Sequence, residues 1–514
     1  LRHRPQRPHR GQHRGRRHVE IINGSKGRIS VKKLAPACLD MVGGEYDFLT
    51  FYGRHAMERN LQRMPVGHGV QKIGSLRGTS SHQYNPAVIL AERETTEDAG
   101  GCWAMSFVYS GGFQSEAGQD QYYQTRLLMG FSEEQFAYPL HPGESLQSPE
   151  VIMSYSSEGL AKLSQNLHRC MRTHLCRGKY KEVVRPILLN SWEASYFDFT
   201  GESLLKLAKE AADLGIEMFV MDDGWFGNRD SELRGLGDWK VNEEKLGCTL
   251  GELISKINEM GLKFGIWIEP EMVNEDSELY REHPDWAFVI PGRRPNRSRH
   301  QLVLDFSRKE IVDYIYEQIC GVLDQGNVEY IKWDMNRSLA DVYSATADSQ
   351  GRVLHDYVLG LYDFLERLVN RYPNILIEGC SGGGGRFDAG MLYYTPQIWC
   401  SDNTDPIDRL RIQYGTSFIY PASSMGAHVS ASPNHQTGRI TPMETRGMVA
   451  MAGTFGYELN LNEISGKEKD EIRRQIAEYK KYAALVQRGL YYRLTNPQTD
   501  NQGAREFVSE DQKE

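Results

Sequence analysis

A regular alternation of short apolar runs and long amphipathic stretches, starting at Pro186, limits the folds open to this chain of 514 residues. Eight runs have the length and the branched or aromatic content of strands, and they begin near residues 186, 216, 263, 301, 328, 374, 397 and 451. Stretches with helical spacing, such as 201–215, 308–326 and 355–372, lie between most of them. This pattern, over about 280 residues, predicts a (β/α)8 TIM barrel. A doubly wound open sheet is the alternative, but no GxGxxG follows any predicted strand, so the barrel is favoured.

The part of the chain before the barrel has a different pattern, in which short alternating stretches replace the helices. GRISVKKL, CWAMSFVYSGGF and YYQTRLLMGF are separated by glycine, asparagine and serine, which form turns. This pattern predicts an antiparallel β-sandwich, joined to the barrel by a helix within 156–175. We therefore predict an incomplete β-sandwich over residues 21–178, a catalytic barrel over 179–490, and the start of a truncated C-terminal β domain over 491–514.

The first twenty residues stand apart, since seven are arginine and four are histidine. We expect residues 1–20 to be disordered, and an arm that binds nucleic acid is the alternative. The formal net charge of −8 gives no support to a nucleic-acid partner. The chain begins with Leu1 instead of Met, so we expect its true start to lie upstream.

The lengths of the apolar runs and the spacing of the cysteines indicate in which cellular compartment the protein resides. No apolar run approaches the roughly 18 to 20 residues that a membrane helix needs, so no membrane partner is expected. The eight cysteines include no CxxC pair, which argues against a zinc ribbon and gives little support to a disulfide scaffold. A reducing compartment is therefore favoured, and we predict that the protein is cytoplasmic.

Carboxylates, tryptophans and a lysine gather where the predicted barrel strands end, which is the face that carries the active site in such barrels. In IKWDMN, Lys332, Asp334 and Asn336 share one face because strand side chains alternate. A lysine so close would help to keep Asp334 ionised, as a nucleophile requires, and a structural ion pair is the alternative. In WCSDNTD, Asp402 directly follows a predicted strand, and a turn cap is the alternative.

Adjacent Asp222 and Asp223 end another predicted strand, and both can reach a ligand only if the chain leaves the sheet at Gly224. Two neighbouring carboxylates are costly to bury without a polar ligand or a counter-charge. A magnesium or calcium site stays open, whereas zinc or iron would normally recruit histidines, which these strand ends lack.

Trp267 is either a platform for a sugar ring or part of the core, and spacing alone favours a solvated loop charge for Arg299. The mixture of residues is typical of a sugar site.

The segments that follow the predicted strands also occur together, in one order, in a known family. They are PILLNSWEASYFDF, FVMDDGWFGNRD, GIWIEPEMVN, HPDWAF, RHQLVLDFS, YIKWDMNR, CSGGGGRFDAGMLYY, CSDNTDPIDRLRIQYGTS and MGAHVSASPNHQTGR. From about residue 184 to 490 the chain resembles glycoside hydrolase family 36, the bacterial and fungal α-galactosidases, and RGTSSHQYNP resembles that family's N-terminal sandwich.

The resemblance implies a retaining mechanism in which Asp334, on the predicted fifth strand, is the nucleophile. It implies that Asp402, on the predicted seventh strand, is the acid/base. Galactose contacts carry over to Asp222, Asp223, Trp267, Arg299, Lys332, Asn336, Cys380 and Gly382, with Trp192 near the edge of the site. The implied substrates are oligosaccharides with terminal α-galactosyl residues, such as melibiose, raffinose and stachyose. The family uses neither metal nor cofactor and forms homo-oligomers, typically tetramers.

Two other functions stay open. One is galactosyl transfer to sugar acceptors, and the other is an inactive, truncated homologue that only binds sugar. The chain departs from the family in two places, because the arginine-rich segment replaces the early part of the usual sandwich and the C-terminal β domain is cut short. These departures bear on folding, assembly and the choice of longer substrates.

Overall fold

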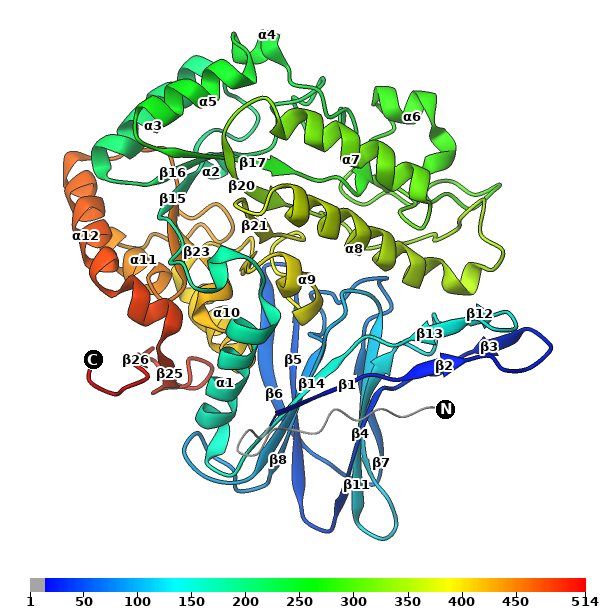
Figure 1. Ribbon diagram of the computed structural model, residues 1–514. Helices are drawn as coiled ribbons and strands as arrows, with labels where there is room; N and C mark the ends of the chain where they lie inside the picture. Colours follow the sequence, from blue (N-terminus) through cyan, green and yellow to red (C-terminus); the bar gives the residue numbers. More distant parts are fainter. Residues whose placement is uncertain (1–13) are drawn as a thin grey trace.

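The computed structural model describes residues 14–514. A strand-rich N-terminal part lies below a barrel of parallel strands surrounded by helices, and helix α1 (Gly159–Cys170) runs along the junction (Figure 1). The predicted fold class, a β-sandwich followed by a TIM barrel and C-terminal strands, is confirmed. The predicted linking helix corresponds to α1, which continues as one π-helical turn over Met171–Leu175.

The N-terminal part consists of two main antiparallel sheets with a buried aromatic core that includes Phe48, Phe107 and Phe113. The six-stranded sheet has the order β1 (Arg14–Arg17), β14 (Val151–Ser156), β9 (Cys102–Phe107), β8 (Ala87–Glu92), β5 (Tyr46–Arg54), β6 (Met57–Pro65). The three-stranded sheet has the order β10 (Phe113–Gln119), β11 (Gln124–Phe131), β4 (Ala37–Val42), with β7 (Gly69–Gly74) against β10. Two short strand pairs complete the N-terminal part: β12 (Tyr138–Leu140) with β3 (Ile29–Val31), and β13 (Ser145–Gln147) with β2 (Glu20–Ile22).

The arginine-rich N-terminal segment is only partly covered by the structure. The predicted disorder is wrong for Arg14–Arg17, which pair antiparallel with Val151–Ser154 at the edge of the six-stranded sheet. Backbone hydrogen bonds to an edge strand need no apolar side chains, which explains how a polar segment can form a strand. The rest of the predicted disorder up to residue 13 lies outside the described residues.

Eight parallel strands close the barrel through pairing of its first and last strands, Leu188 opposite Gly456. They are β15 (Leu188–Asn190), β16 (Met218–Met221), β17 (Lys263–Ile268), β20 (Val328–Trp333), β21 (Leu376–Gly379), β22 (Gln397–Trp399), β23 (Met425–Ser430) and β24 (Thr454–Glu458). These strands are buried along almost their whole length, as expected for a sheet that helices cover on its outer face.

The outer layer follows the predicted amphipathic stretches. The helices are α2 (Trp192–Ser195), α3 (Gly201–Leu214), α4 (Glu243–Leu246), α5 (Leu250–Glu259), α6 (Glu278–Glu282), α7 (Lys309–Leu323), α8 (Val353–Arg371), α9 (Ala389–Tyr394), α10 (Pro406–Thr416), α11 (Met443–Ala450) and α12 (Gly466–Arg488). Local chemistry sets where several begin: Thr200 with Ser203 and Ser465 with Glu468 form capping boxes at the starts of α3 and α12.

One of the eight predicted strands, the fourth, is not in the barrel. Leu302–Val303 forms β19, which pairs antiparallel with β18 (Met272–Val273) in a separate two-stranded sheet. A parallel crossover usually contains a substantial helix. Between β17 and β19 the chain forms only the five-residue α6, and it returns to the barrel after α7, as β20.

The barrel instead contains a strand that is not among the eight predicted ones. Residues Met425–Ser430 are all buried and pair with both β22 and β24. Gly426 and Ala427 weaken its strand signal, because strands favour branched and aromatic residues. Asp334 therefore follows the fourth barrel strand and Asp402 the sixth, not the fifth and seventh as predicted.

The C-terminal residues form a hairpin of β25 (Leu490–Arg493) and β26 (Arg505–Val508). It contacts both domains, since Arg493 forms a 2.7 Å ion pair with Glu97 of the sandwich and lies 3.8 Å from the ring centroid of Phe418 in the barrel. That this hairpin begins a further β domain stays a prediction.

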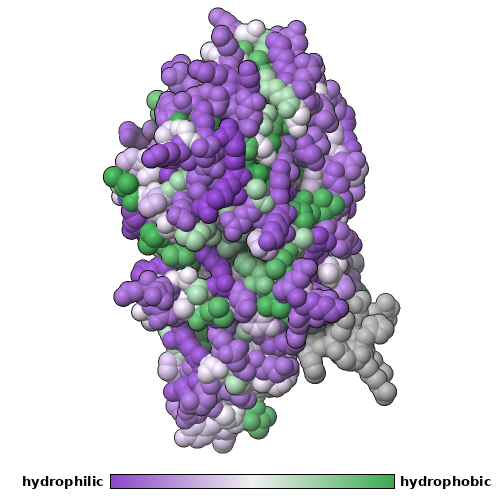
Figure 2. All heavy atoms as spheres, turned by 90° about the vertical axis from the view of Figure 1, so that its left-hand side faces the viewer, coloured by the Kyte–Doolittle hydropathy of each residue, from purple (hydrophilic) through white to green (hydrophobic). Residues whose placement is uncertain are grey.

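The surface facing the viewer in Figure 2 is mostly hydrophilic, with apolar side chains in small groups. Within residues 14–514, none of the helices combines the length and the apolar character needed to cross a membrane.

Candidate active site

A cavity of about 280 Å³ opens where the barrel strands end. We call it the first cavity. It contains nine of the eleven predicted site residues: Trp192, Asp222, Asp223, Trp267, Arg299, Lys332, Asp334, Asn336 and Asp402. Its other lining residues are His55, Glu193, Tyr196, Glu232, Trp399, Thr404, His435, Gln436 and Glu458. Side chains from six of the eight strand ends thus meet in one space, as barrel geometry requires.

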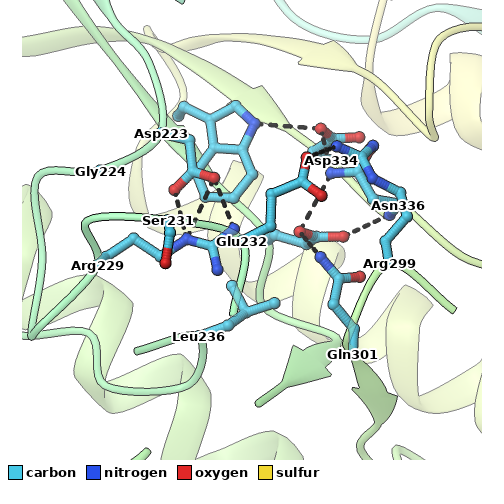
Figure 3. Close-up of polar contacts among 12 residues, drawn as sticks. Asp223, Gly224, Arg229, Ser231, Glu232, Leu236, Arg299, Gln301, Asp334 and Asn336 are labelled. Atoms are coloured by element: carbon cyan, nitrogen blue, oxygen red, sulfur yellow. Dashed lines mark hydrogen bonds and ion pairs between the residues drawn. The ribbon is translucent and has the colours of Figure 1, made fainter. Parts of the chain in front are cut away.

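Asp334 follows β20 directly, and four N–H groups hold its carboxylate. Its Oδ2 accepts from Asn336 Nδ2 at 2.7 Å and Trp267 Nε1 at 3.2 Å. Its Oδ1 accepts from the backbone N–H of Met335 at 2.8 Å and of Gly382 at 3.2 Å. Figure 3 shows the indole and the Asn336 amide converging on this carboxylate. These donors fix the carboxylate in one orientation.

Lys332 pairs with Asp222 and not with Asp334. Its Nζ lies 2.8 Å from Asp222 Oδ2, and both side chains are buried. Burial acts to lower the pKa of Lys332, but Asp222, Glu458 and other anions outweigh it and raise that pKa well above its usual value. The direct contact of Lys332 is thus with the residue after β16, and the charge of Asp334 is also among those that raise the Lys332 pKa. That Lys332 helps to keep Asp334 ionised stays a prediction.

The two adjacent aspartates have different partners. Asn190 Nδ2 donates to Asp222 Oδ2 at 2.7 Å, beside Lys332. Arg229 contacts both oxygens of Asp223, with Nη2 to Oδ2 at 2.7 Å and Nε to Oδ1 at 3.0 Å (Figure 3). Gly224 has a φ of +110°, so the chain turns away from the sheet there and both carboxylates reach the cavity. The counter-charges explain how two neighbouring carboxylates can be buried.

Asp402 follows β22, and its contact comes from the sandwich. His55, in the turn between β5 and β6, places Nε2 2.9 Å from Asp402 Oδ2. The alternative role as a turn cap falls to Asp405, which caps α10 by accepting from the backbone N–H of Ile407 and Asp408.

Arg299 crosses the rim of the cavity. It donates to Asn336 Oδ1 and Glu232 Oε1, both at 2.6 Å, so it is not the freely solvated charge that spacing alone favoured. Glu269 contacts Asn336 in turn, since it accepts from Asn336 Nδ2 at 3.2 Å and from Gln301 Nε2 at 3.0 Å. Burial, and then the charge of Asp334, raise the pKa of Glu269 to about 8.

Cys380 and Gly382 are the two predicted site residues outside the first cavity, yet both adjoin Asp334. Burial and the charges of Asp334 and Asp402 raise the pKa of the Cys380 thiol well above its usual value, so it stays a thiol. Gly382 donates its N–H to Asp334 and lines a neighbouring cavity of about 290 Å³.

This second cavity lies between the loop 77–83 of the sandwich and loops of the barrel. Its lining residues are His55, Arg77, Thr79, Ser81, His82, Gln83, Ser298, Arg299, Met335, Asn336, Arg337, Ser338, Ser381, Gly382 and Gly385. It shares His55, Arg299 and Asn336 with the first cavity.

Sequence reasoning missed several lining residues. Glu458 lies within the predicted strand that begins at Met451 and is the last residue of β24, and Glu193 directly follows Trp192. Burial, and then the charge of Glu458, raise the pKa of Glu193 to about 8. His435, in the loop after β23, also lines the first cavity. No local signal marks His55, because it belongs to another domain.

No group of three or more His, Cys, Asp or Glu side chains in residues 14–514 is arranged to hold a metal ion. The described carboxylates of the first cavity instead have lysine, arginine, amide or histidine partners.

Comparison with known sequences places these residues in a family. Residues 145–489 match the Melibiase family, and residues 16–141 match the glycosyl hydrolase family 36 N-terminal domain. The chain belongs to glycoside hydrolase family 36. The resemblance seen in the sequence is thereby confirmed.

Among family 36 relatives, the chain is 64% identical to the bifunctional alpha-galactosidase/sucrose kinase AgaSK of Mediterraneibacter gnavus, covering 96% of this chain and 52% of that protein. It is 48% identical to alpha-galactosidase AgaA of Geobacillus stearothermophilus, over 97% of this chain and 69% of AgaA. The chain thus spans about half the length of the first relative.

Solved structures of family 36 proteins have nearly the same fold as this chain. The galactosidase domain of AgaSK superposes with a TM-score of 0.95, covering 97% of this chain and 69% of that one. A variant of AgaA in complex with raffinose gives a TM-score of 0.96 at 47% identity, covering 97% of this chain and 70% of that one.

Proposed function

We propose that this chain is the catalytic part of a retaining α-galactosidase, which hydrolyses terminal, non-reducing α-galactosyl residues of oligosaccharides. The observation that carries the proposal is the pairing of Asp334 and Asp402 within one cavity, each with a different kind of partner. Asp334 has N–H donors only, which suits a nucleophile, whereas Asp402 contacts a titratable histidine, which suits a group that exchanges protons.

The mechanism is a double displacement. Asp402 protonates the leaving glycosidic oxygen while Asp334 attacks the anomeric carbon, so the C–O bond to the leaving group breaks and a β-galactosyl ester forms. Asp402 then takes a proton from water, and that water displaces Asp334 from the anomeric carbon. The anomeric configuration is inverted twice and therefore retained.

Binding of galactose falls to the polar residues at the base of the cavity. Asp222, ordered by Lys332, and Asp223, ordered by Arg229, accept hydrogen bonds from the axial 4-hydroxyl and the 6-hydroxyl. An equatorial 4-hydroxyl would leave a buried carboxylate oxygen without its donor, which favours galactose over glucose. Trp267, Arg299, Asn336, Cys380 and Gly382 complete the binding site, with Trp192 at its edge.

The remainder of the oligosaccharide extends past His55 into the second cavity, because the two cavities adjoin there and share His55, Arg299 and Asn336 as lining residues. Variants of one relative, AgaA of Geobacillus stearothermophilus, have structures in complex with raffinose and with stachyose, which supports this class of substrate. We also propose a homo-oligomer, a tetramer as in the family, in the cytoplasm. Light scattering of the purified chain tests the first point, and cell fractionation the second.

Rescue by azide tests the reaction and both carboxylates at once. We expect Asp334→Ala and Asp402→Ala each to lose about 10³-fold or more of the parent's activity on raffinose. With an activated aryl α-galactoside, azide should attack directly in Asp334→Ala and give β-galactosyl azide. In Asp402→Ala, azide should intercept the galactosyl ester and give α-galactosyl azide.

The parent enzyme with azide, and the 4-nitrophenyl α-glucoside, are the controls. The same azide anomer from both variants would refute the assignment of roles. A folded parent that hydrolyses neither galactoside would refute the function. Product analysis with excess sugar acceptor measures how much galactosyl transfer accompanies hydrolysis.

A further inference from the structure

The hairpin of β5 and β6 extends from the sandwich into the barrel and is firmly held there. Arg59 Nε donates to Thr416 Oγ1 at 2.7 Å, and its Nη1 donates to the carbonyl of Gly384 at 2.9 Å. Glu58 accepts from Ser401 Oγ at 2.5 Å, one residue before Asp402. Glu58 and Arg59 are both buried, so these contacts fix the tip of the hairpin relative to the strand end of β22.

His55 is the residue at that tip, and it contacts the proposed acid/base directly. The 2.9 Å separation between His55 Nε2 and Asp402 Oδ2 is that of a charge-assisted hydrogen bond. The side chain of His55 is 53% exposed and that of Asp402 26%, so both can exchange protons with solvent. The edge of the neighbouring His82 ring meets His55, with 5.5 Å between ring centroids.

Charged groups on every side bear on this pair. The pKa of His55 is raised, mainly by its hydrogen bond to Asp402 and further by the charges of Asp402 and Glu58. Burial and the charge of Arg299 oppose this rise. Burial acts to raise the pKa of Asp402, but His55, Arg299 and Lys332 outweigh it and lower that pKa. When the pair in the free enzyme holds one proton, that proton therefore resides mainly on His55.

This distribution is opposite to the one that the first chemical step requires. The leaving group of raffinose is an alkoxide, which must be protonated as the glycosidic bond breaks. A carboxyl group that has already lost its proton cannot act as a general acid, so the proton must come from a neighbour. His55 is the titratable side chain in direct contact with Asp402 among the described residues of the first cavity.

We propose that His55 is a positioning residue that stores the proton which Asp402 delivers to the leaving glycosidic oxygen. The inference rests on the proposed function. On substrate binding the glycosidic oxygen approaches Asp402, the proton moves from His55 Nε2 to Asp402 Oδ2, and His55 becomes neutral. Asp402 passes the proton to the leaving oxygen as Asp334 bonds to the anomeric carbon. In the second step Asp402 takes a proton from water and returns it to His55.

The pH dependence of kcat/KM distinguishes proton storage from a structural role. His55 and Asp402 titrate as a coupled pair with two macroscopic pKa values, and the pair loses its last proton at the higher one. The basic limb of the kcat/KM profile reports this higher value. Removing His55 can only lower it, which moves the limb to lower pH. His55→Gln is the sharpest variant, because its amide nitrogen can take the position of Nε2 and donate to Asp402 without titrating. His55→Ala removes the hydrogen bond as well. His68→Ala is the control, because His68 is an exposed histidine of the sandwich that lines neither cavity.

Two substrates separate this inference from the proposed function. Raffinose needs a proton on its leaving oxygen, whereas 2,4-dinitrophenyl α-galactoside releases a phenolate that needs none. For His55→Gln we expect kcat/KM on raffinose to fall about 10- to 100-fold at pH 7, with the basic limb moved down by about one pH unit or more. On the dinitrophenyl substrate we expect less than about a threefold loss.

Three results would overturn the inference. One is a His55→Gln basic limb at the parent's position, another is equal loss on both substrates, and the third is an equal shift of the limb in His68→Ala. If the parent hydrolyses neither substrate, the proposed function itself fails, and that outcome is visible before any variant is made.

Discussion

The two cavities at the top of the barrel have almost the same volume, about 280 and 290 Å³, and share three lining residues. They differ in the charge of the side chains that line them. Seven carboxylates line the first: Glu193, Asp222, Asp223, Glu232, Asp334, Asp402 and Glu458. No carboxylate lines the second, where arginines, histidines, hydroxyls and glycines predominate. Buried carboxylates are costly, so their concentration in one cavity marks where charge is needed for binding and chemistry.

The cavities also differ in which domain builds them. Among the residues that line the first cavity only His55 comes from the sandwich. The second takes His55, Arg77, Thr79, Ser81, His82 and Gln83 from that domain. Under the proposed function, the barrel carries the reaction centre, whereas the space proposed for the leaving sugar is lined by residues of both domains. The following predictions test this division, from the largest expected effect to the smallest.

Lys332→Met should affect the first cavity most, since it leaves Asp222 buried without its cation. We expect kcat/KM on 4-nitrophenyl α-galactoside to drop about 10³-fold or more, and the free energy of unfolding to fall by about 3–5 kcal/mol. Steady-state kinetics and urea denaturation measure the two effects. The double variant Lys332→Met with Asp222→Asn should recover stability and not activity. Unchanged stability in the single variant would contradict the importance of this pair.

Glu269→Gln should change how stability depends on pH. The pKa of Glu269 is raised to about 8 in the folded protein, against 4.5 ordinarily, so the folded state binds the proton more tightly than the unfolded state. This contribution to stability is fully present below about pH 4.5 and is lost as pH rises to about 8. We expect the parent's melting temperature to decline over this window more steeply than that of Glu269→Gln.

Glu243→Gln, a change at an exposed glutamate outside both cavities, is the control for Glu269→Gln and should follow the parent. Parallel curves for the parent and Glu269→Gln would show that Glu269 is ionised in the folded protein.

Arg77→Ala should give the smallest effect and test the second cavity alone. Arg77 is exposed and lines only that cavity, so we expect KM for raffinose to rise about two- to fivefold through lost contacts to the leaving sugar. The KM for 4-nitrophenyl α-galactoside should stay unchanged. Lys206→Ala, at an exposed site on α3, is the control. An equal change with both substrates would argue against a leaving-sugar site here.

Much of the site could be predicted because strand ends are a local feature. Asp334, Asp402 and the pair Asp222 and Asp223 each follow an apolar run directly, and the structure places all four in the first cavity. The same rule fails at Leu302–Val303, which is apolar and buried but pairs with Met272–Val273 outside the barrel. Burial can be recognised from composition, whereas the pairing partner of a short strand cannot.

The sequence by itself determined the fold class, the family and the residues that carry charge at the ends of the barrel strands. Tertiary structure alone decided which of those charges meet. Lys332 pairs with Asp222, 110 positions away, instead of the nearby Asp334, and Asp402 meets His55 across 347 positions. Periodicity and composition act over a few residues, whereas an ion pair forms wherever closure of the barrel and docking of the sandwich bring two groups within about 3 Å.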